Sequence, residues 1–373
     1  MIFIRVHSRN SLTLFLLLIF SFFSCNGDPE EDPQTWEEAP PLHGIYFGDF
    51  LMGNIISPSD LSDTIRFSYL KRHFNTVTAE NDMKPDYIAP ASKGGAYRFT
   101  DADKIVNEAR AAGMKVVGHT LIWHEQTPSW LTTGTQAEVL SNLEKYVTDV
   151  VEHFEGKLSS WDVVNEAMMW DNWESGSASN WKSCLRPLGE NKWMIIGPEY
   201  IEKAFLAARN ADPEVMLYYN DVNLNRAYKA QAVYNMVNEI NTRYPDVKGR
   251  QLIDGIGMQT HHHLSTNPET VRASIELFAE LGVEIAISEM DIQAAGDLPE
   301  GTVIWGDDAA KRQAALYATL FALFKVHRSN ISRVTFWGID DGTSWLSSTY
   351  PTLLDKDYNL KPAFYAVMHP DRY

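Results

Sequence analysis

The sequence predicts an α/β fold in which about eight strand–helix units close into a parallel (β/α)8 barrel. Three observations predict it. Between residues 42 and 370, short apolar runs alternate with helical patterns. The runs are apolar throughout, as expected for strands that are buried on both faces. Polar residues follow nearly every run at its carboxyl end. An open doubly wound sheet is the competing architecture, but no glycine-rich phosphate-binding fingerprint follows the first run.

The expected strands share an apolar composition rich in β-branched and aromatic residues. In chain order they are 44–51, 74–80, 115–123, 161–166, 215–220, 253–260, 284–291 and 334–339. The count and the order, with a helix after each strand, favour a closed barrel over separate small sheets.

The clearest expected helix follows Thr135, which forms a capping box with Glu138. Other helices are expected to begin with proline at the first helical position, at Pro198 and Pro268, and one ends at Gly282. The helix after Thr135 shows one apolar stripe, formed by Val139, Leu143, Tyr146, Val147, Val150 and Phe154.

The first 25 residues have the composition of a secretory signal. Arg5 and Arg9 precede an apolar run over 12–23, which is shorter than the roughly 20 residues of a membrane span. The run ends at Cys25 and resembles a relaxed bacterial lipoprotein signal in which Cys25 is lipidated. Cleavage without lipidation is the alternative, because two phenylalanines replace the usual pattern before the cysteine.

The remaining chain divides into a short acidic segment and one large domain. Residues 26–41 are rich in proline and acids and are expected to form a flexible tether. Residues 42–373 are expected to form a single barrel domain. Once residues 1–25 are removed only Cys184 remains, so no disulfide framework is expected, and Cys184 is interpreted as a structural thiol.

Composition narrows the class of ligand. A net charge of -17 argues against nucleic acid, because phosphates require a basic surface. The 11 tryptophans and 16 tyrosines exceed what packing alone usually needs, and exposed aromatic faces stack on sugar rings and other flat ligands.

Polar side chains gather where the expected strands end, and in a barrel these ends form one mouth. A buried unpaired polar group costs roughly 1–3 kcal/mol, so a shared site explains them better than packing does. In strand order they are Glu80, Asn81 and Lys84; His119, Trp123, His124 and Gln126; Asn165 and Glu166; Asn220 and Asp221; Gln259 and His261; Glu289 and Asp291; and Trp337.

The chemistry that fits this set is glycoside hydrolysis, in which Glu166 and Glu289 would flank the cleaved bond. Metal hydrolysis is the rival, because His261, His262 and His263 are consecutive. On a strand these neighbours point to opposite faces and no second ligand cluster of suitable spacing follows, so neither a metal nor another cofactor is expected. A serine hydrolase is disfavoured because no G-x-S-x-G elbow follows a strand.

Six stretches together resemble the motifs of glycoside hydrolase family 10, the endo-β-1,4-xylanases. They are FNTVTAENDMK, GHTLIWHEQTPSW, WDVVNEA, GIGMQTHH, ISEMDI and VTFWGIDDGTSW, in order and at similar spacing, and the resemblance covers about residues 45–368. The resemblance implies a single catalytic (β/α)8 TIM barrel that cleaves internal β-1,4-xylosidic linkages in xylan by retaining double displacement.

The resemblance also implies roles for individual residues. Glu166 matches the acid/base and Glu289 the nucleophile. His261 matches the histidine that binds the nucleophile, with Asp291 behind it, and Asn165 matches the residue that holds the sugar 2-hydroxyl. The pKa of Glu166 is expected to be high while Glu289 is charged and to fall once that charge is lost.

The remaining matches describe the walls of the cleft. Glu80, Asn81 and Lys84 match residues that bind the next sugar on the non-reducing side. His119, Trp123, Gln126 and Gln259 match residues around the cleaved sugar, and Trp337 and Trp345 match an aromatic roof. His262 and His263 are expected to lie behind the site or at the surface.

Three positions depart from the family pattern: Pro85 and Val222 replace the common tryptophan and tyrosine, and Leu346 replaces a frequent arginine. The tyrosine lies on the leaving-group side, so Val222 is expected to weaken stacking of the first acceptor sugar. A tryptophan from the loop 168–193 is hypothesised to replace that platform, the candidates being Trp170, Trp173 and Trp181.

Two other functions stay open at this point. A retaining β-1,4-glucanase or mixed-linkage glucanase differs only in small steric features near the cleaved sugar. A non-catalytic glycan-binding surface lipoprotein would keep the aromatics but would not need both carboxyls. We expect a monomer whose partners are xylan and xylo-oligosaccharides, exported to a bacterial outer membrane or cell surface through the lipid on Cys25, or otherwise secreted or periplasmic.

Overall fold

The computed structural model describes residues 32–169, 177–294 and 304–373. The expected signal segment with Cys25, and the candidate platforms Trp170 and Trp173, lie outside these residues. Across the described parts of the chain, no helix is both long and apolar enough to cross a bilayer.

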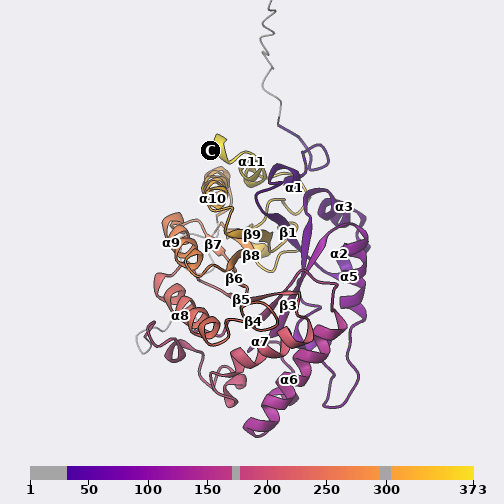
Figure 1. The fold of residues 1–373 in the computed structure, drawn as a ribbon. Helices are drawn as coiled ribbons and strands as arrows, with labels where there is room; N and C mark the ends of the chain where they lie inside the picture. The colour runs from indigo at the N-terminus through magenta and orange to yellow at the C-terminus, as the bar shows by residue number, and fades with distance from the viewer. Residues whose placement is uncertain (1–31, 170–176, 295–303) are drawn as a thin grey trace, which may run out of the picture. The chain divides into compact units, whose positions relative to one another are not determined.

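The centre of the domain is a closed barrel of eight parallel strands, which confirms the predicted fold (Figure 1). Each strand pairs with the next, and the circle closes where Leu51 of the first strand pairs with Arg333 of the last. The barrel strands are β1 Leu51–Ile56, β2 Thr76–Ala79, β3 Lys115–Ile122, β4 Ser160–Asn165, β5 Met216–Asp221, β6 Gly255–Met258, β8 Glu284–Gln293 and β9 Ile331–Phe336.

A ninth short strand, β7 His261–His263, adds only to the carboxyl end of β8, where His261 pairs with Asp291. This extra pairing brings the two side chains to the mouth of the barrel together.

Helices surround the barrel, and one long helix follows each barrel strand (Figure 1). These helices are α3 Thr64–His73, α5 Thr100–Ala111, α6 Gln136–His153, α7 Tyr200–Ala211, α8 Ala227–Arg243, α9 Pro268–Ala279, α10 Asp307–Val326 and α11 Pro362–Met368. Shorter helical segments in the loops are α1 Leu42–Ile45, α2 Pro58–Ser62, α4 Pro85–Ile88, η1 Ser129–Thr132, η3 Trp181–Cys184, η4 Lys192–Ile195, η5 Ser347–Thr349 and η6 Pro370–Arg372.

Local sequence signals explain where several helices begin. The Thr135 hydroxyl and the Glu138 carboxylate form the predicted capping box at α6, and the predicted apolar stripe is buried. Asn267 caps α9, whose first residue is Pro268 as predicted. The prediction for α7 is two residues early, because the helix begins at Tyr200 rather than Pro198.

The first strand was predicted wrongly as 44–51. Part of that run forms α1 and a turn, and β1 begins only at its last residue. The reason is that its aromatic residues pack outside the barrel: the Tyr46 hydroxyl donates to the Val367 carbonyl at 2.6 Å, and the Tyr46 ring stacks on Phe50 with centroids 5.0 Å apart.

The segment 33–41 is also not the flexible tether that its composition predicted. Trp36 is buried, and the Arg72 guanidinium donates to the carbonyls of Trp36 at 3.2 Å and Ala39 at 2.8 Å. The Tyr365 hydroxyl donates to the Pro33 carbonyl at 2.7 Å. These contacts make the segment part of the folded domain, while a tether over residues 26–32 stays a prediction.

Candidate active site

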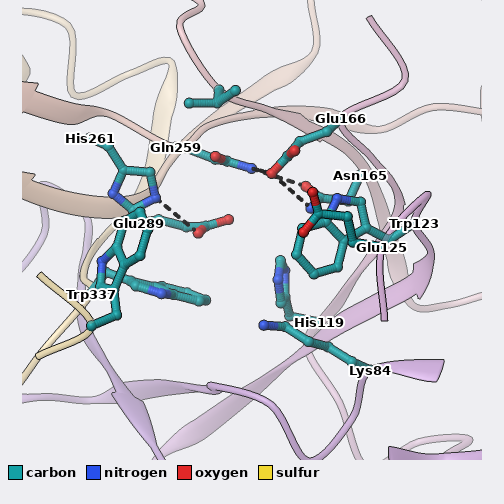
Figure 2. Close-up of a pocket in the computed structure, with 12 residues that line it drawn as sticks. Lys84, His119, Trp123, Glu125, Asn165, Glu166, Gln259, His261, Glu289 and Trp337 are labelled. Carbon is teal, nitrogen blue, oxygen red and sulfur yellow. Dashed lines mark hydrogen bonds and ion pairs between the residues drawn. The ribbon is translucent and has the colours of Figure 1, made fainter. Parts of the chain in front are cut away.

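The mouth at the carboxyl ends of the strands holds a cleft of about 290 Å³, which collects most of the predicted site residues (Figure 2). Glu166 and Glu289 both face it. The lining residues are Lys84, His119, Trp123, Glu125, Asn165, Glu166, Val222, Gln259, His261, Glu289, Trp337 and Trp345.

Glu166 stands directly after β4 in a left-handed backbone conformation, with φ of 53°. Such a conformation is costly for a residue with a side chain and persists only where neighbours hold it. The Glu166 N–H donates to the Asn220 carbonyl at 2.9 Å, and Arg186 Nε donates to the Glu166 carbonyl at 2.9 Å. The backbone is thus fixed on both sides, which aims the carboxyl into the cleft.

Glu289 lies within β8 and receives two hydrogen bonds. Asn220 Nδ2 donates to one carboxylate oxygen at 2.7 Å, and His261 Nε2 lies 3.2 Å from the other. His261 Nδ1 lies 2.9 Å from the Asp291 carboxylate, which also accepts from Trp345 Nε1 at 3.0 Å. The predicted contact of His261 with Glu289, with Asp291 behind it, is therefore present.

Side-chain amides connect the two carboxyls. The Asn165 amide oxygen accepts from Asn220 Nδ2 at 2.9 Å and from Gln259 Nε2 at 3.1 Å. Gln259 Nε2 also donates to Glu166 at 3.0 Å. Turned by half a rotation, the Asn165 amide would instead accept from the Trp123 indole at 3.3 Å. In both orientations Asn165 lies beside Asn220, which contacts Glu289, and beside Gln259, which contacts Glu166.

A glycine makes room for this amide chain. A Cβ atom on Gly257 of β6 would lie 2.2 Å from Asn220 Oδ1, which is far inside contact distance. The absence of a side chain at Gly257 therefore allows Asn220 to reach both Asn165 and Glu289.

The surroundings of Glu289 favour its ionised form. Burial alone would raise the pKa of Glu289, but the His261 hydrogen bond, the charges of His119 and His261 and the Asn220 hydrogen bond together lower it. Burial likewise acts against a charged His261, yet the carboxylates of Asp291 and Glu289 raise the pKa of His261 to about 10. The imidazolium thus stays protonated beside an ionised Glu289 at neutral pH.

The surroundings of Glu166 favour its protonated form. Burial raises the pKa of Glu166, and the negative charges of Asp221 and Glu289 raise it further. The Gln259 hydrogen bond and the Arg186 charge oppose this without reversing it. The cleft therefore pairs one carboxyl whose pKa is raised with one whose pKa is lowered.

The floor and the roof of the cleft are fixed by neighbours. His119 Nδ1 lies 3.0 Å from the Asp162 carboxylate, whose other oxygen contacts Arg333 at 3.3 Å. Trp337 packs edge-on against His119 with centroids 5.3 Å apart, and Trp345 packs likewise on the His261 ring at 5.0 Å. Trp337 is buried, whereas Trp345 remains more than half exposed.

Lys84 lies on the wall near β2, where its Nζ donates to Asn81 at 2.9 Å and stands 5.1 Å above the Trp123 ring. Burial lowers the pKa of Lys84, and burial raises that of Glu80. Glu80, Asn81 and Gln126 do not line the cleft itself. Glu80 lines a neighbouring pocket instead, so the predicted binding roles of these three residues remain predictions.

Of the predicted acceptor platforms, only Trp181 lies in the described residues. It is buried, and its indole N–H donates to Glu239 at 2.7 Å, so it cannot offer a free face and this candidate is wrong. His262 is buried and His263 exposed, within the range expected for them. Pro85 is buried as the first residue of α4. Cys184 is a buried free thiol.

Sequence reasoning missed two residues that hold functional side chains in place. Arg186 lies outside the six motifs and contacts Glu166 from 20 residues away in the chain. Asp162 lies inside WDVVNEA, but its contact with His119, 43 residues away, was not predicted. Glu125 lines the cleft, as the predicted Trp123 does, and only its position in the sequence between Trp123 and Gln126 could have indicated it. Within the described residues, no group of three or more histidine, cysteine, aspartate or glutamate side chains could hold a metal ion.

Comparison with known proteins places the chain among glycoside hydrolases. The family model described as Glycosyl hydrolase family 10 matches residues 42–370. The β-1,4-xylanase of Dictyoglomus thermophilum is 37% identical over 97% of this chain and 99% of its own length. Endo-1,4-β-xylanase A of Thermoanaerobacterium saccharolyticum is 36% identical over 99% of this chain, but the match spans only 31% of that protein.

Solved structures agree with this assignment. A GH10 xylanase with a bacterial Ig-like domain from termite gut superposes with a TM-score of 0.83 at 35% identity, over 91% of this chain and 79% of that one. Xylanase XynB from Paenibacillus barcinonensis gives a TM-score of 0.80 at 31% identity, over 89% and 98% of the two chains. The barrel, the cleft with its two carboxyls and the family match over residues 42–370 together show that the chain belongs to glycosyl hydrolase family 10.

Proposed function

We propose that this protein is an endo-1,4-β-xylanase that cleaves internal linkages of xylan by retaining double displacement. The observation that supports it most is the contrast between two carboxyls in one cleft, one with a raised pKa and one with a lowered pKa. Retaining hydrolysis needs such a pair, one carboxylic acid and one carboxylate.

In the first step, the Glu289 carboxylate attacks the anomeric carbon while the Glu166 carboxylic acid gives its proton to the leaving oxygen. The carbon–oxygen bond of the linkage breaks, an ester bond to Glu289 forms, and the shortened chain leaves as an alcohol. The hydrogen bonds from Asn220 and His261 keep Glu289 ionised before attack.

In the second step, Glu166 takes a proton from water as the water oxygen attacks the same carbon, and the Glu289 carboxylate leaves. Formation of the ester removes the negative charge of Glu289, which was one of the causes that raised the pKa of Glu166. The pKa of Glu166 therefore falls when its role changes from acid to base.

The walls suit a neutral sugar. Asn165 contacts Glu166 directly and reaches Glu289 through Asn220, so it is placed to hold the 2-hydroxyl, a contact that tightens as positive charge develops on the ring. His119, Trp123, Gln259, Trp337 and Trp345 line the same cleft and would enclose the cleaved sugar. No step of the reaction needs a cofactor.

A second candidate is cleavage of β-1,4-glucan. It is favoured by one relative, named exoglucanase XynX, from Acetivibrio thermocellus, which is 36% identical over 90% of this chain, with a match that spans 30% of that protein. Glucose differs from xylose by a hydroxymethyl group, and exclusion of so small a group rests on side chains near the cleaved sugar.

The test is release of reducing sugar and sizing of products by the protein without residues 1–25, on arabinoxylan beside carboxymethylcellulose. The Glu289→Ala variant is the blank. We expect short xylo-oligosaccharides from xylan alone and none from the blank. Release from carboxymethylcellulose at a similar rate would support the glucanase, and release from neither polymer by the folded protein would refute both.

We also propose that Cys25 is lipidated and that the enzyme is displayed on a bacterial membrane surface. The apolar run before Cys25 and the acidic residues after it support this. Mass spectrometry of the full chain expressed in a bacterium is expected to show a diacylglycerol on an amino-terminal Cys25. A soluble product cleaved elsewhere would indicate secretion without an anchor.

A further inference from the structure

The loop after β9 carries Trp345, which lines the cleft. Residues 341–352 of this loop leave the barrel and return to it, and we call them the roof loop. Trp345 is 56% exposed, and between residues 342 and 350 only Ser344 is buried. A loop with so few buried side chains depends for its position on the contacts at its base.

The two ends of the roof loop meet at this base. The Asp341 carboxylate accepts from the Thr352 N–H and from the Thr352 hydroxyl, both at 2.9 Å. The Asp341 N–H donates to the Leu354 carbonyl at 3.1 Å. The second oxygen of the Asp341 carboxylate and the Thr352 carbonyl remain as further acceptors at the closed end.

Lys361, the residue before α11, enters the base from outside the roof loop. It is only 4% exposed, and its Nζ donates to the carbonyls of Tyr350 and Thr352 at 2.7 Å each and lies 2.9 Å from the Asp341 carboxylate. These three acceptors match the three protons of an ammonium. The same Nζ stands 4.6 Å from the centre of the Trp305 ring, which stacks on Tyr350. Lys361 thus joins the first and the last residue of the roof loop.

The helix α10 holds the returning side of the roof loop independently. Gln313 Nε2 donates to the Tyr350 carbonyl at 2.7 Å, and the Tyr317 hydroxyl donates to the Pro351 carbonyl at 2.9 Å. Because these bonds do not involve Lys361, its loss should loosen the outgoing side of the loop without unfolding the barrel.

We propose that Lys361 is a positioning residue for sugar binding, because it joins the two ends of the roof loop and thereby fixes Trp345 over the cleft. The inference rests on the proposed xylanase function and adds a residue on which that function depends. Lys361 does not line the cleft, so its effect passes through the roof loop. A ring that is already fixed loses less conformational freedom when a sugar binds, which favours binding.

The charge of Lys361 makes this role depend on pH. Burial lowers the pKa of Lys361 to about 8, although the carboxylates of Asp341 and Asp355 oppose the shift. From α10 the neutral side chains of Gln313 and Tyr317 reach the same end of the loop. The ammonium is therefore present at neutral pH and is lost as the pH rises through about 8, which leaves one proton too few for the three acceptors.

The experiment is a double-mutant cycle with Lys361→Met and Trp345→Ala, in which kcat and KM are measured on xylotetraose at neutral pH. Methionine keeps much of the length of the lysine side chain but removes the ammonium. Lys356→Met is the matched control, because Lys356 is exposed and pairs with Asp357 at 2.8 Å outside the roof loop.

Lys361→Met should raise KM by about tenfold and change kcat by less than about twofold, because its bonds touch neither Glu166 nor Glu289. With Trp345→Ala already in place, Lys361→Met should change KM by less than about twofold, since the ring that it positions is gone. Lys356→Met should leave both constants unchanged. Equal effects of Lys361→Met in the two backgrounds, or no effect in either, would overturn the proposal.

A second variant keeps the cycle usable if Lys361→Met does not fold. Asp341→Asn keeps the shape of the side chain and an oxygen for Thr352, but it removes the charge that holds Lys361. It should raise KM by about threefold in the wild-type background and have no further effect beside Trp345→Ala. The same rise in both backgrounds would overturn the proposal.

Binding separates this inference from the proposed function. Calorimetric titration of Glu289→Ala with xylotetraose gives affinities without turnover. The affinity should fall by about threefold between about pH 7 and about pH 9, and this fall should be absent when Lys361→Met is added. If the wild type does not cleave xylotetraose but the affinities follow the cycle, the proposed hydrolysis fails and the role of Lys361 stands. If the affinities are equal with and without Lys361, that role fails whatever the activity.

Discussion

The two sides of the cleft treat the same chemical group in opposite ways. Both Glu166 and Glu289 are carboxyls withdrawn from water. On the side of β8, His261 and Asn220 donate to the carboxylate and overcome the cost of burial. On the side of β4, nearby negative charges add to that cost. The difference teaches that hydrogen-bond partners and charges, rather than depth of burial, move the pKa values of the two carboxyls apart.

The largest expected effect on activity comes from removing the ionised carboxyl, that of Glu289. Glu289→Ala should lower kcat on xylan by at least about 10⁴-fold, because no carboxylate remains to form the ester. With azide present, this variant should form an α-linked sugar azide, because azide then attacks in place of Glu289. Chromatography and NMR of the products check this, and a β-linked azide would reverse the assigned roles.

Removal of the Glu166 carboxyl should slow the cleavage of substrates whose leaving group needs a proton far more than the cleavage of those whose leaving group does not. Glu166→Ala should slow xylan cleavage by about 10³-fold, but it should affect formation of the ester little for an aryl xylobioside whose leaving group needs no proton. Azide should here give the β-linked product, because it attacks the ester on Glu289. The values of kcat/KM on both substrates, which report formation of the ester, decide the point. An equal loss of kcat/KM on both would mean that Glu166 is not the proton donor.

The next variant removes the imidazolium of His261, which keeps Glu289 ionised. The protonated His261 lowers the pKa of Glu289, so His261→Gln should raise that pKa and move the acid limb of the kcat/KM profile to higher pH. A fall in kcat of about 10²-fold should accompany the shift. The pH profile on an aryl xylobioside measures it, and an acid limb that stays in place would show that His261 acts only through packing.

Substitution of Arg186 tests how the surrounding charges set the pKa of Glu166. Its guanidinium lies 3.7 Å from a Glu166 carboxyl oxygen and opposes the raised pKa of Glu166. Arg186→Met should therefore move the basic limb to higher pH and lower kcat about tenfold, since the bond to the Glu166 carbonyl is lost as well. Arg186→Lys keeps the charge, so its basic limb should stay near the wild-type position. A shift of the basic limb to lower pH in Arg186→Met would show that the Arg186 charge does not lower the pKa of Glu166.

The smallest expected effect on activity concerns the part of the cleft that would bind the leaving-group sugar. Val222 lines the cleft without offering an aromatic face. Val222→Tyr should lower KM for long xylo-oligosaccharides by roughly threefold through stacking, and leave the pH profile unchanged. Product sizing against time checks it, with Val222→Leu as the control for bulk alone. An equal change in both variants would mean that volume, not stacking, is responsible.

The sequence was a good guide where one residue type serves one local purpose. The capping box at Thr135, the strand-to-helix rhythm and the two carboxyls at strand ends all follow from short-range rules, and the structure confirms the barrel. The first strand was missed because β1 holds the buried Asn54 in its middle, which hid its apolar run behind the more aromatic residues before it.

The residues that the sequence could not supply are those that act through space. Arg186 and Asp162 reach their partners only after the chain has folded. Arg186 lies outside the six motifs, and Asp162 lies in a different motif from its partner His119. The segment 33–41 resembled a tether by composition, yet Trp36 is buried, because carbonyl groups of this segment bind Arg72. Composition indicates only the average tendency of a segment to fold. These contacts depend instead on a single residue far away in the sequence, Arg72.

The most direct test of the central contrast is to trap the ester. The protein is inactivated with a 2-deoxy-2-fluoro-β-xylobioside that carries a dinitrophenyl leaving group, then digested and analysed by mass spectrometry. We predict one added fluoroxylobiosyl group per molecule, located on Glu289. A label on Glu166, or full turnover of xylan without any labelling, would contradict it.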